Sequence, residues 1–562
     1  MGSRRHTGLL LVDLLLGFGV ERVFGLPGGQ TMALYDGILE RAPRIRHVLV
    51  RDERTAAYAA DAYGRLTGKV GVCDATVGPG AAKLPSGLGE ALNSSIPVLA
   101  LVSDLPRKWR EYEAFGVASQ GLDQAALLAP VTKWLARVEA PEELPELVAR
   151  AFREATTGRP GPVALLLPQD VLDADAPDTN RAAHGSGTFP AERVEPAAEE
   201  IEAAARALRG AQRPFLLVGG GALIAGAGEA VVALAERLGA AVGTTLSGKG
   251  AISETHPLAA GVVGSLGTTA AAELLREADA VVLLGTKAGS VATFGFTLPT
   301  EQQTVVHVDL EPRLGTRVRA DARIGAERLA ATVSPRNKLL QGAWGARIDD
   351  AVGRWRALRD AERSSDSVPI APQRVIGELD RVLGGGDVLV ADASLASGWA
   401  GVYVEQAEPG RRMLFPRGLA GLGFAVPAAI GAAVARPDAR VFALAGDGAL
   451  SYAVGELATI VQHDLPVTIV VLNNASLGWI RWYRRIAFGR GHEAEDLSRV
   501  DFAAVARAYG FNGAHVERPD ELADALALEP PSLIDVATGV WETPVLPHKD
   551  ALAGAVEASY GS

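Results

Sequence analysis

The chain has 562 residues, of which 48% are hydrophobic and 22% charged, so it is long enough for three or four folded domains and too apolar to be intrinsically disordered. Its net charge of −11 at pH 7 argues against a general nucleic-acid-binding protein, which needs a basic excess. The single cysteine, Cys73, excludes an intrachain disulfide framework and a cysteine-rich metal site.

The first apolar segment, residues 8–20, contains Asp13 and leads into Glu21 without a small-residue cleavage site. It is therefore interpreted as a core helix and not as a signal peptide. No uninterrupted apolar run in the sequence reaches the length of a membrane-spanning helix. We therefore expect a cytoplasmic protein with neither a membrane nor a nucleic acid as its partner.

The first predicted domain, residues 1–180, alternates short apolar strands with helical patterns. A helix is expected at residues 56–66. Buried parallel strands are expected at residues 70–76, 97–103 and 162–167. A stretch rich in Ala, Pro, Gly and Asp then marks a linker.

The second predicted domain, residues 190–335, and the third, residues 370–542, repeat this alternation. Strands are expected at residues 214–218, 280–284, 304–308, 387–391, 440–445, 466–472 and 531–536. The final stretch, residues 543–562, shows no strong period and is interpreted as a tail that could close as a lid over the active site. The expected fold class is α/β, with three doubly wound parallel-sheet domains and a C-terminal tail.

The strongest motif is a Gly-Asp-Gly sequence around Asp447, followed after 24 residues by a pair of asparagines that ends at Asn474. Each half of the motif follows a predicted strand, and doubly wound sheets bind ligands at the carboxyl ends of neighbouring strands. The carboxylate of Asp447, the amide oxygen of Asn474 and a main-chain carbonyl near Ser476 are hard oxygen ligands of the kind that Mg²⁺ prefers. The motif therefore predicts a magnesium site.

The same strand ends are expected to bind phosphate groups. Gly446 and Gly448 would let the main chain approach them closely, and a helix predicted at residues 451–463 would point its N-terminus at them. Ser394 and Ser397, just past another predicted strand, are further candidates for contact with the phosphate oxygens.

These motifs resemble the signature of thiamine diphosphate (ThDP) enzymes, and the resemblance covers nearly the whole chain. Residues 24–29, which include Pro27, look like the family's opening turn, and residues 73–80 match a strand and loop of its pyrimidine-binding domain. The resemblance implies a pyrimidine-binding domain, a middle nucleotide-type domain and a diphosphate-binding domain, in that order. It also implies ThDP and Mg²⁺ as cofactors.

Within this resemblance, Glu53 is the glutamate that hydrogen-bonds the aminopyrimidine ring. A carboxylate on one ring nitrogen stabilises the imino tautomer, which then removes the proton from the thiazolium carbon. Residues 417–427 match the stretch that holds the cofactor bent, with Leu422, next to Gly421, as an apolar wedge beneath the two rings. The family places the cofactor between two subunits, so a homodimer or homotetramer is implied.

The kind of ThDP enzyme is less clearly indicated. Acetolactate synthases resemble the chain overall, but their Phe-Gln-Glu stretch appears here as Ser119-Gln120-Gly121, and their Gln-Trp pair as Trp482-Tyr483. The decarboxylases of pyruvate and benzoylformate rely on active-site histidines, and no histidine occurs in residues 68–130. Gln120 remains a candidate catalytic residue.

Residues that follow the metal motif border the substrate in the family. His492 and Glu493 are candidate proton carriers, with solvated loop charges as an equal interpretation, and Trp479 is a candidate wall residue. The remaining candidates for substrate contact are Arg411, Arg412 and Arg417. These arginines could hold the phosphates of coenzyme A, although a surface cluster explains them equally well.

Taken together, the chain is most similar to a 2-hydroxyacyl-CoA lyase, within the acetolactate synthase and oxalyl-CoA decarboxylase group. Such an enzyme cleaves a 2-hydroxyacyl-CoA to an aldehyde or ketone plus formyl-CoA. The alternatives are an acetolactate synthase-like 2-oxoacid decarboxylase and carboligase, with or without FAD, and, more distantly, a non-catalytic ThDP-binding protein. In the middle domain Asp309 could bind a ribose hydroxyl of ADP or FAD, and a domain without nucleotide is an equal alternative.

Overall fold

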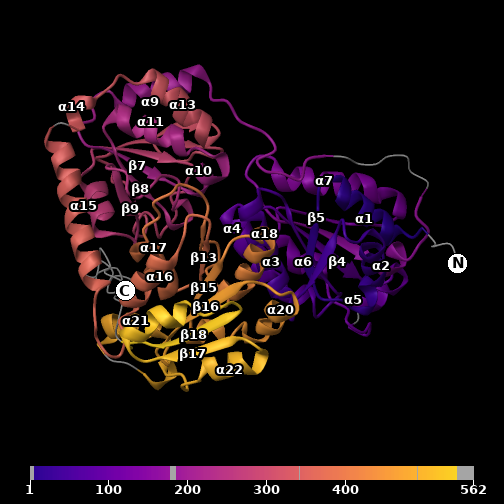
Figure 1. Ribbon diagram of the computed structural model, residues 1–562. Coiled ribbons are helices and arrows are strands. Elements are labelled where there is room, and N and C mark those ends of the chain that lie inside the picture. Colours follow the sequence, from indigo (N-terminus) through magenta and orange to yellow (C-terminus); the bar gives the residue numbers. More distant parts are fainter. Residues whose placement is uncertain (1–4, 115, 178–184, 341, 490–491, 541–562) are drawn as a thin grey trace. The chain divides into compact units, whose positions relative to one another are not determined.

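The computed structural model describes residues 5–114, 116–177, 185–340, 342–489 and 492–540. They form three parallel sheets of six strands each, flanked by helices (Figure 1). The predicted α/β fold class with three doubly wound sheets is therefore confirmed. The predicted tail at residues 543–562 lies outside the described residues.

The first sheet has the order β2-β1-β3-β4-β6-β5. The strands expected from buried apolar runs are β3 (Gly71–Ala75), β4 (Val98–Asp104) and β6 (Val163–Pro168). The three that the sequence did not reveal are β1 (Arg22–Gly25), β2 (Arg46–Leu49) and β5 (Trp134–Arg137). Each of these has only four residues, which is too short for a clear alternation of apolar and polar side chains.

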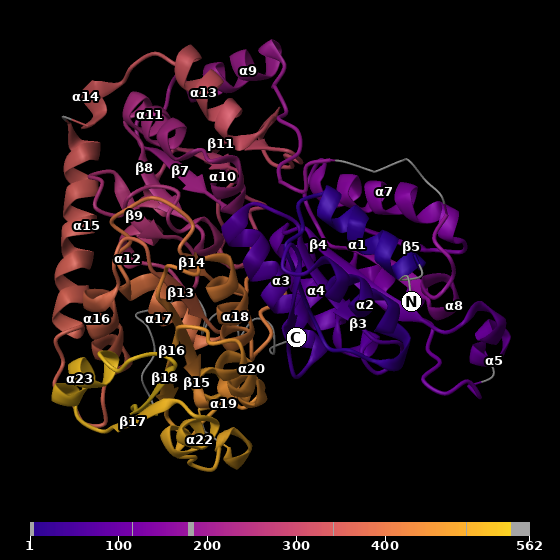
Figure 2. The same ribbon diagram turned by 45° about the vertical axis from the view of Figure 1, so that its right-hand side comes forward.

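Helix α3 (Glu53–Thr67) is the central helix of this part of the chain. It begins at Glu53 because the side chain of Asp52 caps it, accepting the N–H of Arg54. It ends at Gly68, whose φ of 68° a glycine adopts without strain. Its alanine-rich face packs against α18 (Ala425–Ala435), as both Figure 1 and Figure 2 show.

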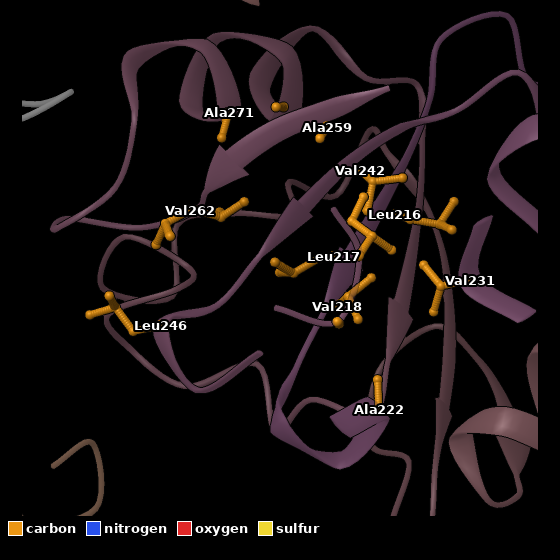
Figure 3. Close-up of a cluster of buried hydrophobic side chains, with 14 of the residues drawn as sticks. Leu216, Leu217, Val218, Ala222, Val231, Val242, Leu246, Ala259, Val262 and Ala271 are labelled. Carbon is orange, nitrogen blue, oxygen red and sulfur yellow. The ribbon is translucent and has the colours of Figure 1, made fainter. Parts of the chain in front are cut away.

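The second sheet has the order β12-β11-β10-β7-β8-β9. Its strands are β7 (Pro214–Val218), β8 (Ala241–Thr244), β9 (Ala259–Val262), β10 (Ala280–Leu284), β11 (Thr304–Asp309) and β12 (Thr316–Arg319). The helices pack on one another in groups, α11 (Gly228–Leu238) on α13 (Ala322–Thr332) and α12 (Thr269–Glu277) on α15 (Ala343–Glu362). Figure 3 shows part of the aliphatic core between the strands and helices, built mainly of Leu, Val and Ala side chains.

The third sheet has the order β14-β13-β15-β16-β18-β17. Its strands are β13 (Val388–Ala391), β14 (Met413–Leu414), β15 (Val441–Gly446), β16 (Val467–Asn473), β17 (Asn512–Val516) and β18 (Ser532–Ala537). Within the described part of the chain, every helix is too short or too polar to cross a lipid bilayer.

The compact units of the structure do not coincide with the three predicted domain ranges. Unit 1 comprises Met1–Glu192, Pro416–Val441 and Ala453–Val467. Unit 2 comprises Arg193–Phe415, Phe442–Tyr452 and Thr468–Ser562. Two segments of the third predicted domain, including α18, therefore pack with the first sheet, and the middle domain shares a unit with the third sheet.

Candidate functional site

In unit 2, polar residues gather where three neighbouring strands end. Strands β13, β15 and β16 lie side by side, and they are followed directly by Asp392, Asp447 and Asn474. This carboxyl edge is where open parallel sheets bind their ligands.

Asp447 is held by main-chain donors at this edge. Its side chain is 6% exposed, and Oδ1 accepts the N–H of Gly448 at 2.9 Å. Burial raises the pKa of Asp447 from its ordinary value of 3.8 to about 6, although main-chain hydrogen bonds from Gly448, Ala475 and Ser476 act in the opposite direction. The buried carboxylate of Asp447 could therefore bind a cation.

The turn at Asn474–Ser476 folds around that carboxylate. Oδ1 of Asn474 accepts the N–H of Ser476 at 3.1 Å, and Ala475 has a φ of 50°. The carbonyl of Ser476 accepts the N–H of Gly478 at 2.9 Å and keeps a second lone pair. A carboxylate, an amide oxygen and a carbonyl oxygen are thus brought together, a donor set that could hold Mg²⁺.

The prediction of one continuous helix at residues 451–463 is wrong. The chain forms three short pieces instead, α19 (Asp447–Leu450), the 3-10 helix η7 (Val454–Glu456) and α20 (Leu457–Gln462). The break follows from local chemistry, because the hydroxyl of Ser451 bonds back to the Asp447 carbonyl and Gly455 is a poor helix former. Gly446 is the residue before α19, and the main chain at Gly446 and Gly448 flanks the Asp447 side chain.

The two serine candidates beside β13 differ in their surroundings. Ser394 precedes α17 (Leu395–Tyr403) with a φ of 66°, a strained conformation for a non-glycine residue, and its side chain is half-buried. Ser397 is fully buried, and its hydroxyl donates to the carbonyl of Asp392 at 2.6 Å. The geometry therefore favours Ser394 over Ser397 as a phosphate ligand.

The predicted proton carriers lie on an exposed segment after the metal motif. His492 and Glu493 are both exposed, and Nδ1 of His492 accepts the N–H of Ala494. The buried acid of this segment is Glu495, which the sequence did not single out. Its side chain is 2% exposed and lies 2.6 Å from Nε of Arg484.

Trp479 packs against Trp482, with ring centroids 5.3 Å apart and the ring planes inclined by 30°, at the margin of the hydrophobic core of unit 2. This arrangement fits a wall residue. In the middle domain, Asp309 is the last residue of β11, and its carboxylate accepts the N–H of Glu311 at 3.0 Å. The glycine-rich turn after β7 is packed closely, because a Cβ on Gly219 would lie 2.4 Å from the carbonyl oxygen of Gly285.

In unit 1, Glu53 is the first residue of α3 and its side chain is 4% exposed. A Cβ on Gly80 would lie 2.7 Å from Oε1 of Glu53, so the loop approaches the carboxylate closely and requires glycine there. Among the described residues, Oε2 finds no hydrogen-bond partner, although it is buried. A buried acceptor atom in this state fits a ligand that donates a hydrogen bond.

Gln120 and Pro27 lie around the same loop. Nε2 of Gln30 donates to Oε1 of Gln120 at 3.2 Å, and the hydroxyl of Thr76 donates to Oε1 of Gln30 at 3.3 Å. Gln120 has a φ of 64°, and its carbonyl faces Gly78, while Pro27 is exposed. The structure thus places Gln120 beside the loop that contains Gly78 and Gly80, and this loop also contacts Glu53. Gln30 links Gln120 to Thr76, which lies in the same loop.

A buried glutamate, Glu456, supports the turn before Glu53. Its side chain is 2% exposed and accepts the N–H of Arg51 at 3.0 and 3.2 Å and the hydroxyl of Thr459 at 2.6 Å. Sequence reasoning missed this residue. The only sign of its role in the sequence was its position as a single acid within an apolar helical stretch.

The predicted wedge loop is anchored by another buried glutamate, Glu90. Its carboxylate accepts the N–H groups of Gly418, Leu419 and Ala420 at 2.7, 2.7 and 3.1 Å. Burial by itself would raise the pKa of Glu90, but Arg65 and these hydrogen bonds outweigh burial and lower it. The loop that carries half-buried Leu422 is therefore fixed by a charged acceptor.

Gly421, within this loop, lies close to Tyr58, since a Cβ at position 421 would be 2.9 Å from the Tyr58 hydroxyl. Arg417 belongs to the same unit, and burial lowers its pKa, with the charge of Glu90 opposing this effect.

The other two predicted arginines belong to unit 2. Arg411 donates to the carbonyl of Gly220 at 3.3 Å, and Arg412 donates to the carbonyls of Gly385 and Glu408. Arg411 and Arg412 thus bind main-chain carbonyls, and a role of the three arginines in binding phosphates stays a prediction.

Comparison with known proteins agrees with this geometry. Models of the thiamine pyrophosphate (that is, ThDP) enzyme family match three parts of the chain. The model of the N-terminal TPP-binding domain matches residues 5–127, that of the central domain residues 201–330, and that of the C-terminal TPP-binding domain residues 392–536.

Relatives extend the similarity over nearly the whole chain. The chain is 33% identical to a probable acetolactate synthase large subunit of Methanocaldococcus jannaschii, over 97% of this chain and 94% of the relative. It is 34% identical to an acetolactate synthase of Arthrospira platensis (95% and 94% covered) and 32% identical to the acetolactate synthase isozyme 3 large subunit of Escherichia coli (92% and 91% covered). The chain therefore belongs to the family of ThDP-dependent enzymes of the acetolactate synthase type.

Proposed function

We propose that this ThDP-dependent enzyme is a 2-oxoacid decarboxylase and carboligase that also requires Mg²⁺. The observation that carries the proposal is the buried Glu53 carboxylate, whose Oε2 has no hydrogen-bond partner in the described part of the chain. The names of the acetolactate synthase relatives support the choice of reaction.

The residues divide the work between binding and proton transfer. Asp447, Asn474 and the Ser476 carbonyl would hold Mg²⁺, whose charge would offset that of the diphosphate. When bound, ThDP would supply a nucleophilic carbon for the reaction with a 2-oxoacid. Glu53 would hold a proton at a ring nitrogen of the cofactor. Leu422, on the loop that Glu90 anchors, would give the cofactor rings an apolar support.

A second candidate is the 2-hydroxyacyl-CoA lyase reaction. The observation that favours it is sequence-based, since Gly121 and the pair Trp482-Tyr483 stand where acetolactate synthases have pocket residues. In this reaction Glu493, exposed near the metal turn, would remove the hydroxyl proton as the carbon–carbon bond breaks.

A substrate screen with ThDP and Mg²⁺ separates the two reactions. We expect pyruvate, alone or with a second 2-oxoacid, to be consumed with release of CO₂ and formation of a longer hydroxy-oxoacid. Production of formyl-CoA from 2-hydroxyacyl-CoA thioesters, without consumption of 2-oxoacids, would instead establish the lyase. Flavin absorbance of the purified protein tests for FAD in the middle domain, and release of ADP on denaturation tests for ADP.

Substitution of the metal carboxylate should separate cofactor binding from folding. Asp447→Ala is expected to weaken Mg²⁺-dependent ThDP binding by about 10²-fold or more, because it removes the one charged ligand of the site. Calorimetric titration measures this effect. Asp524→Ala, which removes an exposed acid of the same unit, is the control and should bind normally. Unchanged affinity in Asp447→Ala would rule out the metal assignment.

The raised pKa of Asp447 also predicts a pH dependence. Because the proton binds more tightly in the folded state, this group favours the metal-free fold below pH 3.8, and that contribution is lost as pH rises through about 6. Protons and Mg²⁺ compete for the carboxylate, so affinity should fall about tenfold per pH unit below pH 6. The rise in melting temperature caused by Mg²⁺ with ThDP should be larger at pH 7.5 than at pH 5.

We further propose a homodimer or homotetramer in which Glu53 of one subunit and Asp447 of another serve the same cofactor. Two inactive variants, Glu53→Gln and Asp447→Ala, should then complement each other when refolded or co-expressed together. Half of the randomly mixed dimers contain one intact site, so activity should recover to about a quarter of the native value. No recovery in demonstrably mixed dimers would place both residues of each site in a single chain.

A further inference from the structure

A lysine lies beside the Glu53 carboxylate in unit 1. It is Lys83, the last residue of the 3-10 helix η2 (Ala81–Lys83), and its N–H donates to the carbonyl of Gly80 at 3.1 Å. Nζ of Lys83 lies 3.3 Å from Oε2 of Glu53 and 3.4 Å from Oδ2 of Asp52. The main chain therefore fixes the point from which this side chain reaches two acids.

Lys83 is charged at neutral pH. Burial by itself would lower the pKa of Lys83, but the negative charges of Glu53 and Asp52 outweigh burial and raise it. The Lys83 side chain is 45% exposed, whereas that of Glu53 is 4% exposed. The partly exposed ammonium group of Lys83 therefore lies beside the buried carboxylate of Glu53.

Other titratable groups also lie near Glu53. Asp52 is an acid that pairs with Lys83, and Nε of Arg54 lies 4.0 Å from Oδ1 of Asp52. The pKa of Tyr35 is raised, first by burial, then by the charge and hydrogen bond of Asp74, and also by the charge of Glu53, so its phenol stays neutral. A buried carboxylate costs free energy unless a charge or hydrogen bonds compensate it. Lys83, at 3.3 Å from Oε2, provides such a charge.

We propose that Lys83 is a positioning residue for Glu53, because its ammonium group holds the Glu53 carboxylate in the orientation in which Oε2 can meet the ring nitrogen of ThDP. The inference rests on the proposed role of Glu53.

The test compares Lys83→Gln with the charge-conserving Lys83→Arg, each with and without Glu53→Gln. Calorimetric titration of ThDP with Mg²⁺ at pH 8 gives the affinity. Lys83→Gln should weaken binding about tenfold, because the carboxylate loses the cation that orients it. Lys83→Arg should restore the affinity to within about threefold of the native value, because it keeps the charge.

The Glu53→Gln background separates this inference from the proposed function. There Lys83→Gln should change affinity less than about twofold, because no carboxylate remains for the cation to act on. Native affinity in Lys83→Gln, failure of Lys83→Arg to restore the affinity, or a full effect of Lys83→Gln in the Glu53→Gln background would overturn the inference. If Glu53→Gln alone leaves ThDP binding and turnover unchanged, the proposed role of Glu53 fails instead.

Discussion

Glu53→Gln is expected to reduce turnover by about 10³-fold while ThDP-free protein keeps its fold. The glutamine side chain has nearly the same shape and fits against Gly80, but its amide cannot hold the proton at the ring nitrogen as a carboxylate does. Steady-state kinetics with saturating ThDP and Mg²⁺ measure the loss. Circular dichroism and the melting temperature establish that the fold is retained.

The matched control for this variant is Asp52→Asn. Asp52 is adjacent in sequence and carries the same charge, yet its role is to cap α3, which asparagine also does well. We expect its turnover to stay within tenfold of the native value. A Glu53→Gln enzyme as active as the control would remove Glu53 from the chemistry.

Lys249→Met is expected to destabilise unit 2 by about 3–5 kcal/mol, because it leaves a buried charge without its partner. Lys249 is 1% exposed, and its Nζ lies 2.5 Å from both carboxylate oxygens of Glu254. Oε2 of Glu254 also accepts the N–H of Gln406 at 2.7 Å. The ion pair therefore connects the middle domain to the segment after α17.

Urea unfolding monitored by intrinsic fluorescence measures this effect as a shift of the transition midpoint. The double variant Lys249→Met with Glu254→Gln removes both charges, so its loss should be clearly smaller than that of Lys249→Met alone. If the single and double variants unfold at the same urea concentration, the cost comes from lost packing and not from an unpaired charge.

The fold, and the position of the candidate metal residues at strand ends, could be predicted because their signals are local in sequence. Buried parallel strands such as β7 and β16 are continuous apolar runs, and functional groups such as Asp447 stand directly after them. The same reasoning located Glu53, where the resemblance to a known family supplied the role.

The supporting residues could not be predicted because their partners are distant in sequence. Glu90 binds main-chain groups more than 300 positions later, and Glu456 binds one about 400 positions earlier. In the sequence each is simply an acid on a helix, which is usually solvated. Only the folded arrangement shows that both are buried and bonded to turns that carry candidate site residues.

The way in which the chain returns to unit 1 limits how its gene can be recombined. The two late segments of that unit, Pro416–Val441 and Ala453–Val467, are encoded far from Met1–Glu192. A crossover with a relative's gene in the segment just after α15, near residue 365, would pair α3 with a foreign α18. The contact at Gly431, where a Cβ would lie 2.1 Å from the Ala59 carbonyl oxygen, tolerates no larger residue. Viable chimeras should therefore exchange all three segments together.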